Sequence, residues 1–120
     1  MEPNVHYQSL ETPTWCIADF CLIPIGTSTP SVSSEVAAVQ RLMKSSGLSY
    51  EMHSAGTTLE GSWEDVFRII GQAHTLVHKN QAVRIQSDIR VGTRTDKCQR
   101  FSQKVSKVEE ILGAEKSSTV

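Results

Sequence analysis

One segment near the N-terminus constrains the fold more strongly than any other part of the chain. Residues 15–23, WCIADFCLI, are apolar at both odd and even positions, and Asp19 is their only charged side chain. A strand that is apolar on both sides is usually central in its sheet and covered on both faces. The segment therefore predicts a buried middle strand, which Pro24 and the polar loop behind it should end.

Apolar residues recur at helical spacing in three later segments, at residues 32–43, 62–80 and 97–113. Ser31 or Ser33 is available to cap the first helix and Ser62 the second, because a serine hydroxyl accepts a hydrogen bond from a free backbone N–H of the first turn. Gly47 and Gly113 should end the first and third helices.

The remaining segments alternate between apolar and polar residues, as strands do. Residues 48–53 and 57–60 predict a hairpin around Gly56, and residues 83–91 predict a last strand. The order is β-α-β-β-α-β with a helix at the end. Two βαβ crossovers joined by a hairpin specify an α+β fold, the ferredoxin-like β-α-β-β-α-β sandwich, with an additional C-terminal helix. We expect one domain at residues 15–113, between a flexible arm at 1–14 and a flexible tail at 114–120.

The two helices of such a fold cover one face of the sheet, which leaves the second face of the apolar middle strand exposed. Either the additional helix covers that face, or another copy of the chain does. The polar side chains of the last strand suit a surface on which a partner subunit closes, and two-fold symmetry is the commonest arrangement. A small-molecule pocket would fit at such an interface.

Charge is nearly balanced over the chain but unevenly distributed along it. Lys and Arg number 12 against 13 Asp and Glu, for a net charge of -1. Residues 79–107 carry eight basic and two acidic side chains, whereas residues 1–78 carry three and eight and residues 108–120 carry one and three. The balance argues against a protein that coats phosphate backbones. The last strand has no aromatic residue to stack on RNA bases, so we expect no nucleic-acid partner. The uneven distribution suggests complementary patches between copies, although pairing within one chain is the simpler interpretation.

Cysteine usage indicates a reducing, cytoplasmic setting. Cys16, Cys21 and Cys98 are too few and too scattered for a disulfide framework, and their spacing matches no zinc motif. The first residues lack the early Lys or Arg of secretory and transit peptides. The longest nearly uncharged stretch, residues 21–34, contains prolines and a glycine, so we expect no membrane helix.

Motifs for catalysis are scarce. No P-loop, GxGxxG, GxSxG or HExxH pattern occurs, so we expect no catalytic residues and no enzyme activity. His53 and Glu60 lie on facing strands and would form an acid–base pair if they approached, whereas the alternative for His53 is a polar residue at a strand end. His74 and His78 have the i, i+4 spacing of metal ligands on a helix, but no third ligand joins them, so we expect no metal.

Three groups of residues resemble a known family. They are Pro24 with Gly26-Thr27 and Pro30-Ser31, then Tyr50-Glu51 with Gly56-Thr57 and Glu60-Gly61, and finally Arg94-Thr95-Asp96-Lys97. In this order and spacing, over residues 16–112, they are similar to the small thiamine-binding, YkoF-like proteins. The resemblance implies a ferredoxin-like subunit that dimerises through its sheet and forms a homotetramer, a dimer of dimers. It also implies binding of thiamine or a related hydroxymethylpyrimidine compound, with no catalysis and no cofactor.

Binding of thiamine needs an apolar wall, groups that hydrogen-bond the pyrimidine, and a carboxylate near the thiazolium charge. The candidates are Tyr50 and Met52 for the wall, Thr27, Ser31, Thr57 and Ser87 for the hydrogen bonds, Glu60 or Asp88 for the carboxylate, and His53 beside them. Structural alternatives exist for several of these residues. Thr27 and Ser31 would belong to the loop and cap the first helix, Glu60 would form an interfacial ion pair with an arginine such as Arg84 or Arg90, and Ser87 would leave room for a packed helix.

The leading hypothesis is a non-catalytic oligomer that binds a thiamine-like molecule at or near a subunit interface. Its partners would be its own copies and the small molecule, with no nucleic acid and no membrane. Two alternatives stay open: an enzyme that uses His53 and Glu60 at the interface, and a structural or regulatory oligomer without a small ligand.

Overall fold

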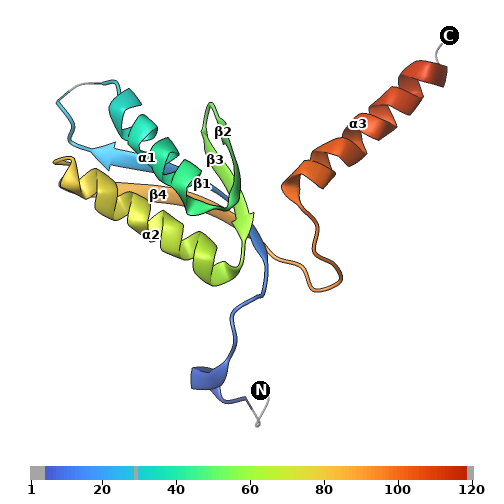
Figure 1. The fold of residues 1–120 in the computed structure, drawn as a ribbon, viewed down its shortest axis with the longest axis horizontal. Helices are drawn as coiled ribbons and strands as arrows, with labels where there is room; N and C mark the ends of the chain where they lie inside the picture. Colours follow the sequence, from blue (N-terminus) through green and yellow to red (C-terminus); the bar gives the residue numbers. More distant parts are fainter. Residues whose placement is uncertain (1–4, 29, 119–120) are drawn as a thin grey trace.

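The computed structural model describes residues 5–28 and 30–118, and Figure 1 shows their fold. Four antiparallel strands form one sheet in the order β2-β3-β1-β4. The strands are β1 (Cys16–Ile25), β2 (Ser49–His53), β3 (Gly56–Gly61) and β4 (Arg84–Gly92), and the helices are α1 (Ser33–Ser46), α2 (Trp63–Lys79) and α3 (Phe101–Ser118). This order and sheet topology confirm the predicted ferredoxin-like fold with an additional C-terminal helix.

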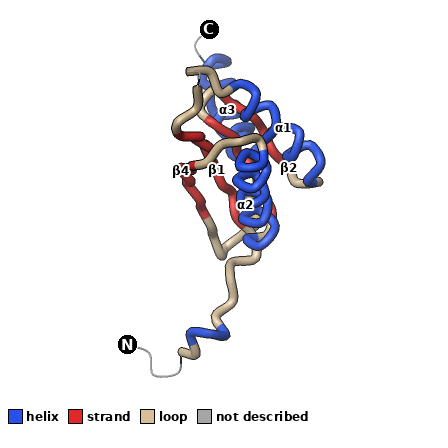
Figure 2. Tube along the Cα trace, turned by 90° about the vertical axis from the view of Figure 1, so that its left-hand side faces the viewer, coloured by secondary structure: helices blue, strands red, loops and turns tan. Residues whose placement is uncertain are grey.

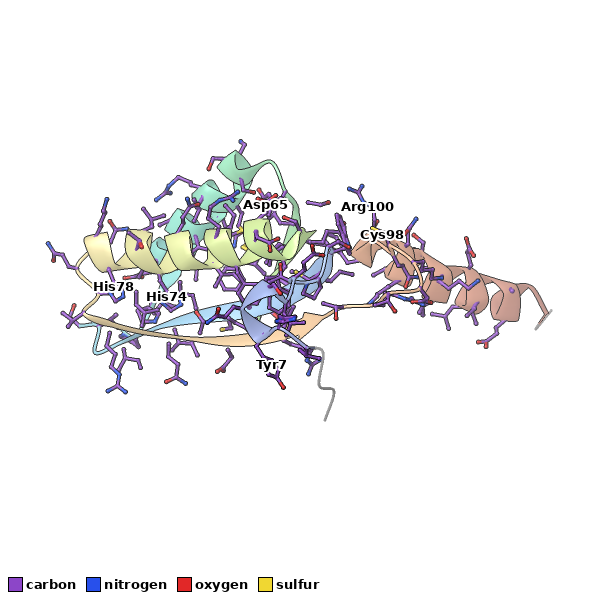
Figure 3. The ribbon with its side chains drawn as sticks, turned by 90° about the horizontal axis from the view of Figure 1, so that it is seen from below. Tyr7, Asp65, His74, His78, Cys98 and Arg100 are labelled. Carbon is purple, nitrogen blue, oxygen red and sulfur yellow. The ribbon has the colours of Figure 1, made fainter. Side chains whose placement is uncertain are left out.

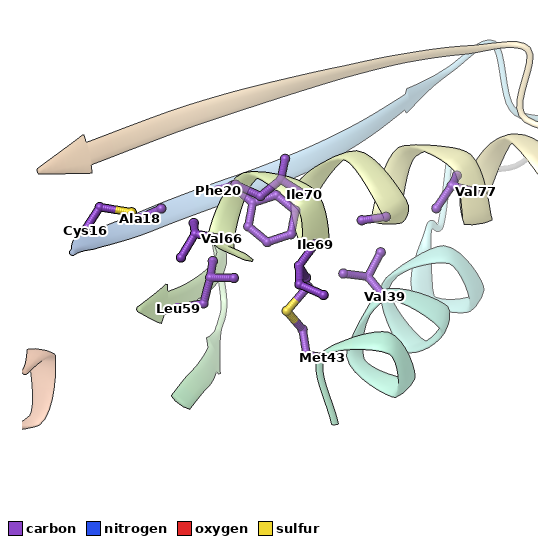
Figure 4. Packing of buried hydrophobic residues seen from close by; sticks show 11 residues of the cluster. Cys16, Ala18, Phe20, Val39, Met43, Leu59, Val66, Ile69, Ile70 and Val77 are labelled. Carbon is purple, nitrogen blue, oxygen red and sulfur yellow. The ribbon is translucent and has the colours of Figure 1, made fainter. Parts of the chain in front are cut away.

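The core lies between the sheet and the helices α1 and α2. Cys16, Ala18 and Phe20 alternate along β1, so their side chains point to the helix-covered face, where they are buried. Figure 4 shows Phe20 among buried side chains of α1 and α2; the cluster also contains Val39, Met43, Leu59, Val66, Ile69, Ile70, Ala73 and Val77. Burial of this apolar surface is the main stabilisation of the domain.

β1 is longer than the sequence predicts. Residue Pro24 lies inside the strand, which continues to Ile25, so the expectation that Pro24 ends it is wrong. The last pair between β1 and β3 joins Phe20 to Thr57, whereas β1 stays paired with β4 as far as Ile25. Beyond Phe20 one side of β1 is therefore a sheet edge, where a residue without a backbone N–H is tolerated.

Helix termini follow the predicted caps in part. Ser62 caps α2 by accepting a 3.2 Å hydrogen bond from the backbone N–H of Asp65, as expected. Gly47 ends α1 with a left-handed φ of 78°. The N-cap position of α1 is Val32, which differs from both predicted serines, although the hydroxyl of Ser31 accepts a 3.4 Å hydrogen bond from the N–H of Ser33.

α3 differs from its prediction at both ends. The helix begins at Phe101 rather than near Lys97, and it continues through Gly113 to Ser118. The expected tail from residue 114 is thus helical as far as Ser118, and residues 119–120 lie outside the described residues. A helical glycine costs about 1 kcal/mol relative to alanine, which weakens a helix without necessarily ending it.

Residues 5–14 extend away from the sheet and its helices, as Figure 2 shows, and contain one short 3-10 helix at Tyr7–Ser9. A hydrogen bond from the hydroxyl of Thr12 to the carboxylate of Glu64 ties this segment to α2. Residues 1–4, also part of the expected arm, lie outside the described residues.

The second face of the sheet, called here the open face, carries the other side chains of β1. These are Ile17, Asp19, Cys21, Ile23 and Ile25, with Arg84, Gln86, Asp88 and Arg90 beside them on β4. Figure 3 shows α1 and α2 on one side of the sheet and α3 extended beyond its end. The alternative in which the additional helix covers this face within the same chain is therefore wrong.

Candidate functional site: a pocket beside the free edge of β1

A pocket of about 240 Å³ lies where β3 stops short of the end of β1. Leu22, Ile23 and Pro24 line one wall, on the side of β1 where no strand pairs with it beyond Phe20. The N-terminal half of α1 and the turn between β2 and β3 form the other walls. The pocket therefore lies between the unpaired edge of one strand, a helix and a turn.

The conformation of Gly56 brings the turn close to β1. Its φ is 155°, and a Cβ atom added there would lie 2.4 Å from the backbone oxygen of Phe20. A distance this short is a clash with rigid backbone, so only glycine fits. Gly56 therefore allows the hairpin to close against β1 and define the near wall of the pocket.

The lining is mainly apolar, with a few polar groups. Leu22, Pro24, Val32, Val36 and Val39 supply apolar surface. The polar lining side chains are Glu35, Gln40, His53, Ser54 and Thr57. Small-molecule sites commonly combine an apolar lining with a small number of polar groups that orient the ligand.

Gln40 and Thr57 are joined across the pocket. The side-chain amide of Gln40 on α1 donates a 2.8 Å hydrogen bond to the hydroxyl of Thr57 on β3. Thr57 is buried, whereas Glu35, five residues before Gln40 on α1, is half-buried and supplies the carboxylate of the lining. The pair and the carboxylate give the pocket donors, acceptors and one negative charge.

His53 has partners for both ring nitrogens. Its Nε2 lies 3.0 Å from Oδ1 of Asp19 on the open face, and its Nδ1 accepts a 3.3 Å hydrogen bond from the N–H of Ala55. In the neutral ring this places the proton on Nε2, which donates to Asp19. The side chain fixes the turn beside the pocket and leaves no ring nitrogen available as a general base.

The proposed acid–base pair of His53 and Glu60 is not formed. In the β2–β3 hairpin His53 is opposite Gly56, whereas Glu60 is opposite Ser49. Four residue steps along a strand separate the two positions by about 13 Å. The prediction that these side chains act together is wrong.

Glu60 instead holds the start of α3. Its carboxylate is almost completely buried, and one oxygen accepts a 2.8 Å hydrogen bond from the backbone N–H of Phe101. The other oxygen lies 3.6 Å from Nε of Arg100, so within the chain Glu60 pairs with Arg100, an arginine other than the two that the sequence suggested. A carboxylate at this position interacts favourably with the N-terminal end of the helix dipole.

The other residues that the sequence suggests for ligand binding lie at separate places in the molecule. Tyr50 and Met52 line a separate groove between α1 and β2, and Asp88 lies in a depression of the open face with Asp19 and Arg90. Ser87 lies 2.7 Å from Nε2 of His74 on α2, and Thr27 and Ser31 belong to the loop between β1 and α1. Of the nine candidates, only His53 and Thr57 line the pocket.

The sequence does not predict three residues of α1 that line the pocket, which are Glu35, Val36 and Gln40. Val36 belongs to the apolar positions of α1, yet 39 % of it is exposed, unlike its buried neighbour Val39. Glu35 directly precedes Val36, and Gln40 follows it by one helical turn on the same side of the helix. A helical stripe bordered by a carboxylate and an amide was the signal available in the sequence.

Several titratable side chains outside the pocket have shifted pKa values; one of them is Arg94, whose pKa is raised by its hydrogen bond to Asp96. Burial, with a smaller effect of Glu64, raises the pKa of the Cys16 thiol. The hydrogen bond from Thr12 lowers the pKa of Glu64. In the linker between β4 and α3, the guanidinium of Arg94 lowers the pKa of Asp96 to about 2.

Within residues 5–28 and 30–118, no three His, Cys, Asp or Glu side chains are grouped so that they could hold a metal ion. Over the same residues, no helix combines the length and apolar character that crossing a bilayer requires.

The fold and this pocket define a small ferredoxin-like protein with a candidate ligand site at an unfinished edge of its sheet. The model of the thiamine-binding protein family matches residues 18–109. The chain therefore belongs to the thiamine-binding protein family. The match spans β1 from residue 18 onward, the other three strands, α1, α2 and the first half of α3.

Relatives and solved structures agree with this assignment. The chain is 46 % identical over 96 residues to the UPF0045 protein ECM15 of Eremothecium gossypii, covering 80 % of this chain and 91 % of that protein. It is 40 % identical over 104 residues to a UPF0045 protein of Synechocystis, covering 87 % and 84 %. A hypothetical protein of Methanocaldococcus jannaschii has a TM-score of 0.72 at 27 % identity, covering 81 % and 98 %.

A further solved structure shares the fold alone. It is a Thermotoga maritima protein provisionally named for thiamine biosynthesis or salvage, with a TM-score of 0.66 at 17 % identity, covering 78 % of this chain and 98 % of that one.

Proposed function

We propose that the chain binds thiamine or a related hydroxymethylpyrimidine compound, without catalysing a reaction, in the pocket beside β1. The observation that carries the proposal is the combination of an apolar pocket with the Gln40–Thr57 hydrogen bond and the carboxylate of Glu35. The name of the family and that of the Thermotoga maritima relative point to the same class of ligand.

The size of the pocket suits a single heteroaromatic ring. Its volume of about 240 Å³ is below the range of roughly 300–1,000 Å³ that accommodates drug-sized ligands. Val36 and Val39 offer apolar contact to a ring face, and Gln40 with Thr57 offers hydrogen bonds to ring nitrogens and an exocyclic amine.

Glu35 supplies a negative charge that would balance the positive charge of the thiazolium ring of thiamine. A thiazolium ring carries a positive charge, which a half-buried carboxylate at the pocket offsets more effectively than one in open water. This role replaces the one expected of Glu60, which is occupied by Phe101 and Arg100.

The same proposal includes self-association in the cytosol. The open face has apolar side chains of β1 bordered by charged side chains of β4, a combination that suits contact with another copy. We expect a homotetramer, arranged as a dimer of dimers, with no cofactor, nucleic acid or membrane partner.

Isothermal titration calorimetry tests the ligand. Thiamine, its phosphates and hydroxymethylpyrimidine are titrated separately into the full chain, and binding of at least one with a matching increase in melting temperature is the expected result. Absence of heat and of any thermal shift at millimolar ligand would contradict the proposal.

A matched pair of variants tests the site. Glu35→Gln should weaken thiamine more than the uncharged hydroxymethylpyrimidine, because only thiamine has the cationic ring. Glu51→Gln removes an exposed carboxylate of β2 outside the pocket and should leave both affinities unchanged. Equal effects of the two variants would place the ligand elsewhere.

A further inference from the structure

A basic groove adjoins the pocket along α1. The groove has a volume of about 640 Å³ and lies between α1 on one side and Tyr50 and Met52 of β2 on the other. Val32, Val36 and Gln40 line both the groove and the pocket, so the two cavities are neighbours that share a wall. A ligand whose ring is held in the pocket can therefore extend into the groove.

Two cationic side chains belong to the lining of the groove. They are Arg41 and Lys44, which lie three residues apart on α1 and therefore on one side of the helix. Neither side chain forms an ion pair with another residue in the described part of the chain. Like charges at neighbouring positions of a helix repel each other, and an anion bound between them would relieve that repulsion.

The nearby carboxylates point elsewhere. Glu35 is the only acidic residue of α1, and it lines the pocket but not the groove. Glu51 lies between Tyr50 and Met52 on β2, and because strand residues alternate, its side chain is directed to the opposite face of the sheet. The side chains that line the groove therefore carry positive charge and no negative charge.

Pocket and groove together present opposite charges in a fixed order. Glu35 and Arg41 are six residues apart, which is about 9 Å along the axis of α1 at 1.5 Å per residue. The pocket has room for one ring, so the remainder of a larger ligand would lie in the groove. A phosphorylated thiamine has the complementary order of charges, because a short flexible arm joins its cationic thiazolium ring to an anionic phosphate.

We propose that the groove binds the phosphoryl group of the ligand, so that the site takes thiamine phosphate or diphosphate in preference to thiamine. The planar guanidinium of Arg41 suits paired hydrogen bonds to two phosphate oxygens, and the ammonium of Lys44 adds a second positive charge. The inference rests on the proposed function of the pocket, and it specifies which chemical form of the ligand the protein takes.

Isothermal titration calorimetry with thiamine and thiamine phosphate tests this preference. The wild-type chain should bind thiamine phosphate about 10-fold more tightly, because hydrogen bonds between charged groups are among the stronger ones in proteins. Arg41→Gln/Lys44→Gln should bring the ratio of the two affinities close to one. Lys79→Gln/Lys107→Gln removes two positive charges outside the groove and should keep the wild-type ratio. Circular dichroism should show the same fold in both variants, because all four side chains are exposed.

Glu35→Gln separates the two parts of the site. Both compounds contain the thiazolium ring, so this substitution should weaken them by nearly the same factor and preserve the ratio of their affinities. A ratio that falls as far as it does in Arg41→Gln/Lys44→Gln would contradict the division of charge between pocket and groove.

Three results would overturn the inference: a wild-type ratio near one, a ratio that survives the loss of Arg41 and Lys44, and an equal loss in the control variant. If thiamine still binds in those cases, only the role of the groove is refuted and the proposed function stands. If neither compound binds the wild-type chain, the proposed function fails as well.

Discussion

The backbone N–H of Phe101 donates a 2.8 Å hydrogen bond to the buried carboxylate of Glu60, which lies 41 positions earlier in the sequence. This contact joins the end of β3 to the start of α3. It explains why a glutamate is tolerated at a site that is only 2 % exposed, since its oxygens are satisfied by a backbone donor and by the nearby Arg100.

Glu60→Ala should lower the free energy of unfolding by about 1–3 kcal/mol, because the N–H of Phe101 then loses its partner. Hydrogen exchange at the first turn of α3 should accelerate at the same time. Urea denaturation and exchange mass spectrometry measure the two effects. Glu51→Ala, at an exposed position, should change stability by less than about 0.5 kcal/mol. Equal effects of the two substitutions would show that the contact is unimportant.

Gly56→Ala should destabilise the chain by about 1–3 kcal/mol, because the new Cβ meets the backbone oxygen of Phe20 and the φ of 155° is unfavourable for alanine. Thermal unfolding followed by circular dichroism gives the measurement. Gly71→Ala is the control: no neighbouring atom lies within 4 Å of its Cβ position, and alanine should stabilise α2 by roughly 0.5–1 kcal/mol. A neutral Gly56→Ala would mean that the hairpin does not approach β1 so closely.

The carboxyl group of Asp96 should titrate at about 2 in the folded chain, since Arg94 stabilises its ionised form. The usual value is 3.8, so the contribution of this pair to stability is fully present above that pH and is lost as the pH falls through about 2. NMR titration of the side-chain carboxyl resonance measures the pKa. Arg94→Gln should return it toward 3.8, and a normal pKa in the unsubstituted chain would contradict the ion pair.

Cysteine alkylation should proceed in a defined order. Cys98 is exposed and should react with iodoacetamide first, whereas Cys16 is buried and burial raises the pKa of its thiol, which disfavours the reactive thiolate. Mass spectrometry of peptides after timed alkylation separates the sites. Cys16 should react only when urea unfolds the chain; rapid reaction under native conditions would show that β1 is less buried than the structure indicates.

Much of the fold follows from the periodicity of apolar residues along the sequence. Two predicted element ends are wrong, and both were placed at residues that commonly interrupt strands or helices. Pro24 lies inside β1 and Gly113 inside α3. Local propensity alone cannot show that β3 stops opposite Phe20, which turns that part of β1 into an edge where proline is acceptable. Gly113 is a weak helix breaker, and the residues on both sides of it favour continuation.

The candidate site was only partly predictable for a different reason. Facing strands were expected to bring His53 and Glu60 together, but the turn at residues 54–55 sets the register, and that register places them at opposite ends of the hairpin. Glu35 and Gln40 come from α1, and their approach to β1 depends on the crossing of helix over sheet, which the spacing of residues in one element does not contain.

The unequal lengths of β3 and β1 have a consequence for how such a binding site can change. Extending both arms of the hairpin by two residues would continue the ladder along Leu22–Pro24 and fill the pocket with main chain, without altering one core side chain. Shortening the arms would widen it. The volume that this scaffold leaves for a ligand is thus adjustable by insertion or deletion in a single turn, with the core side chains left in place.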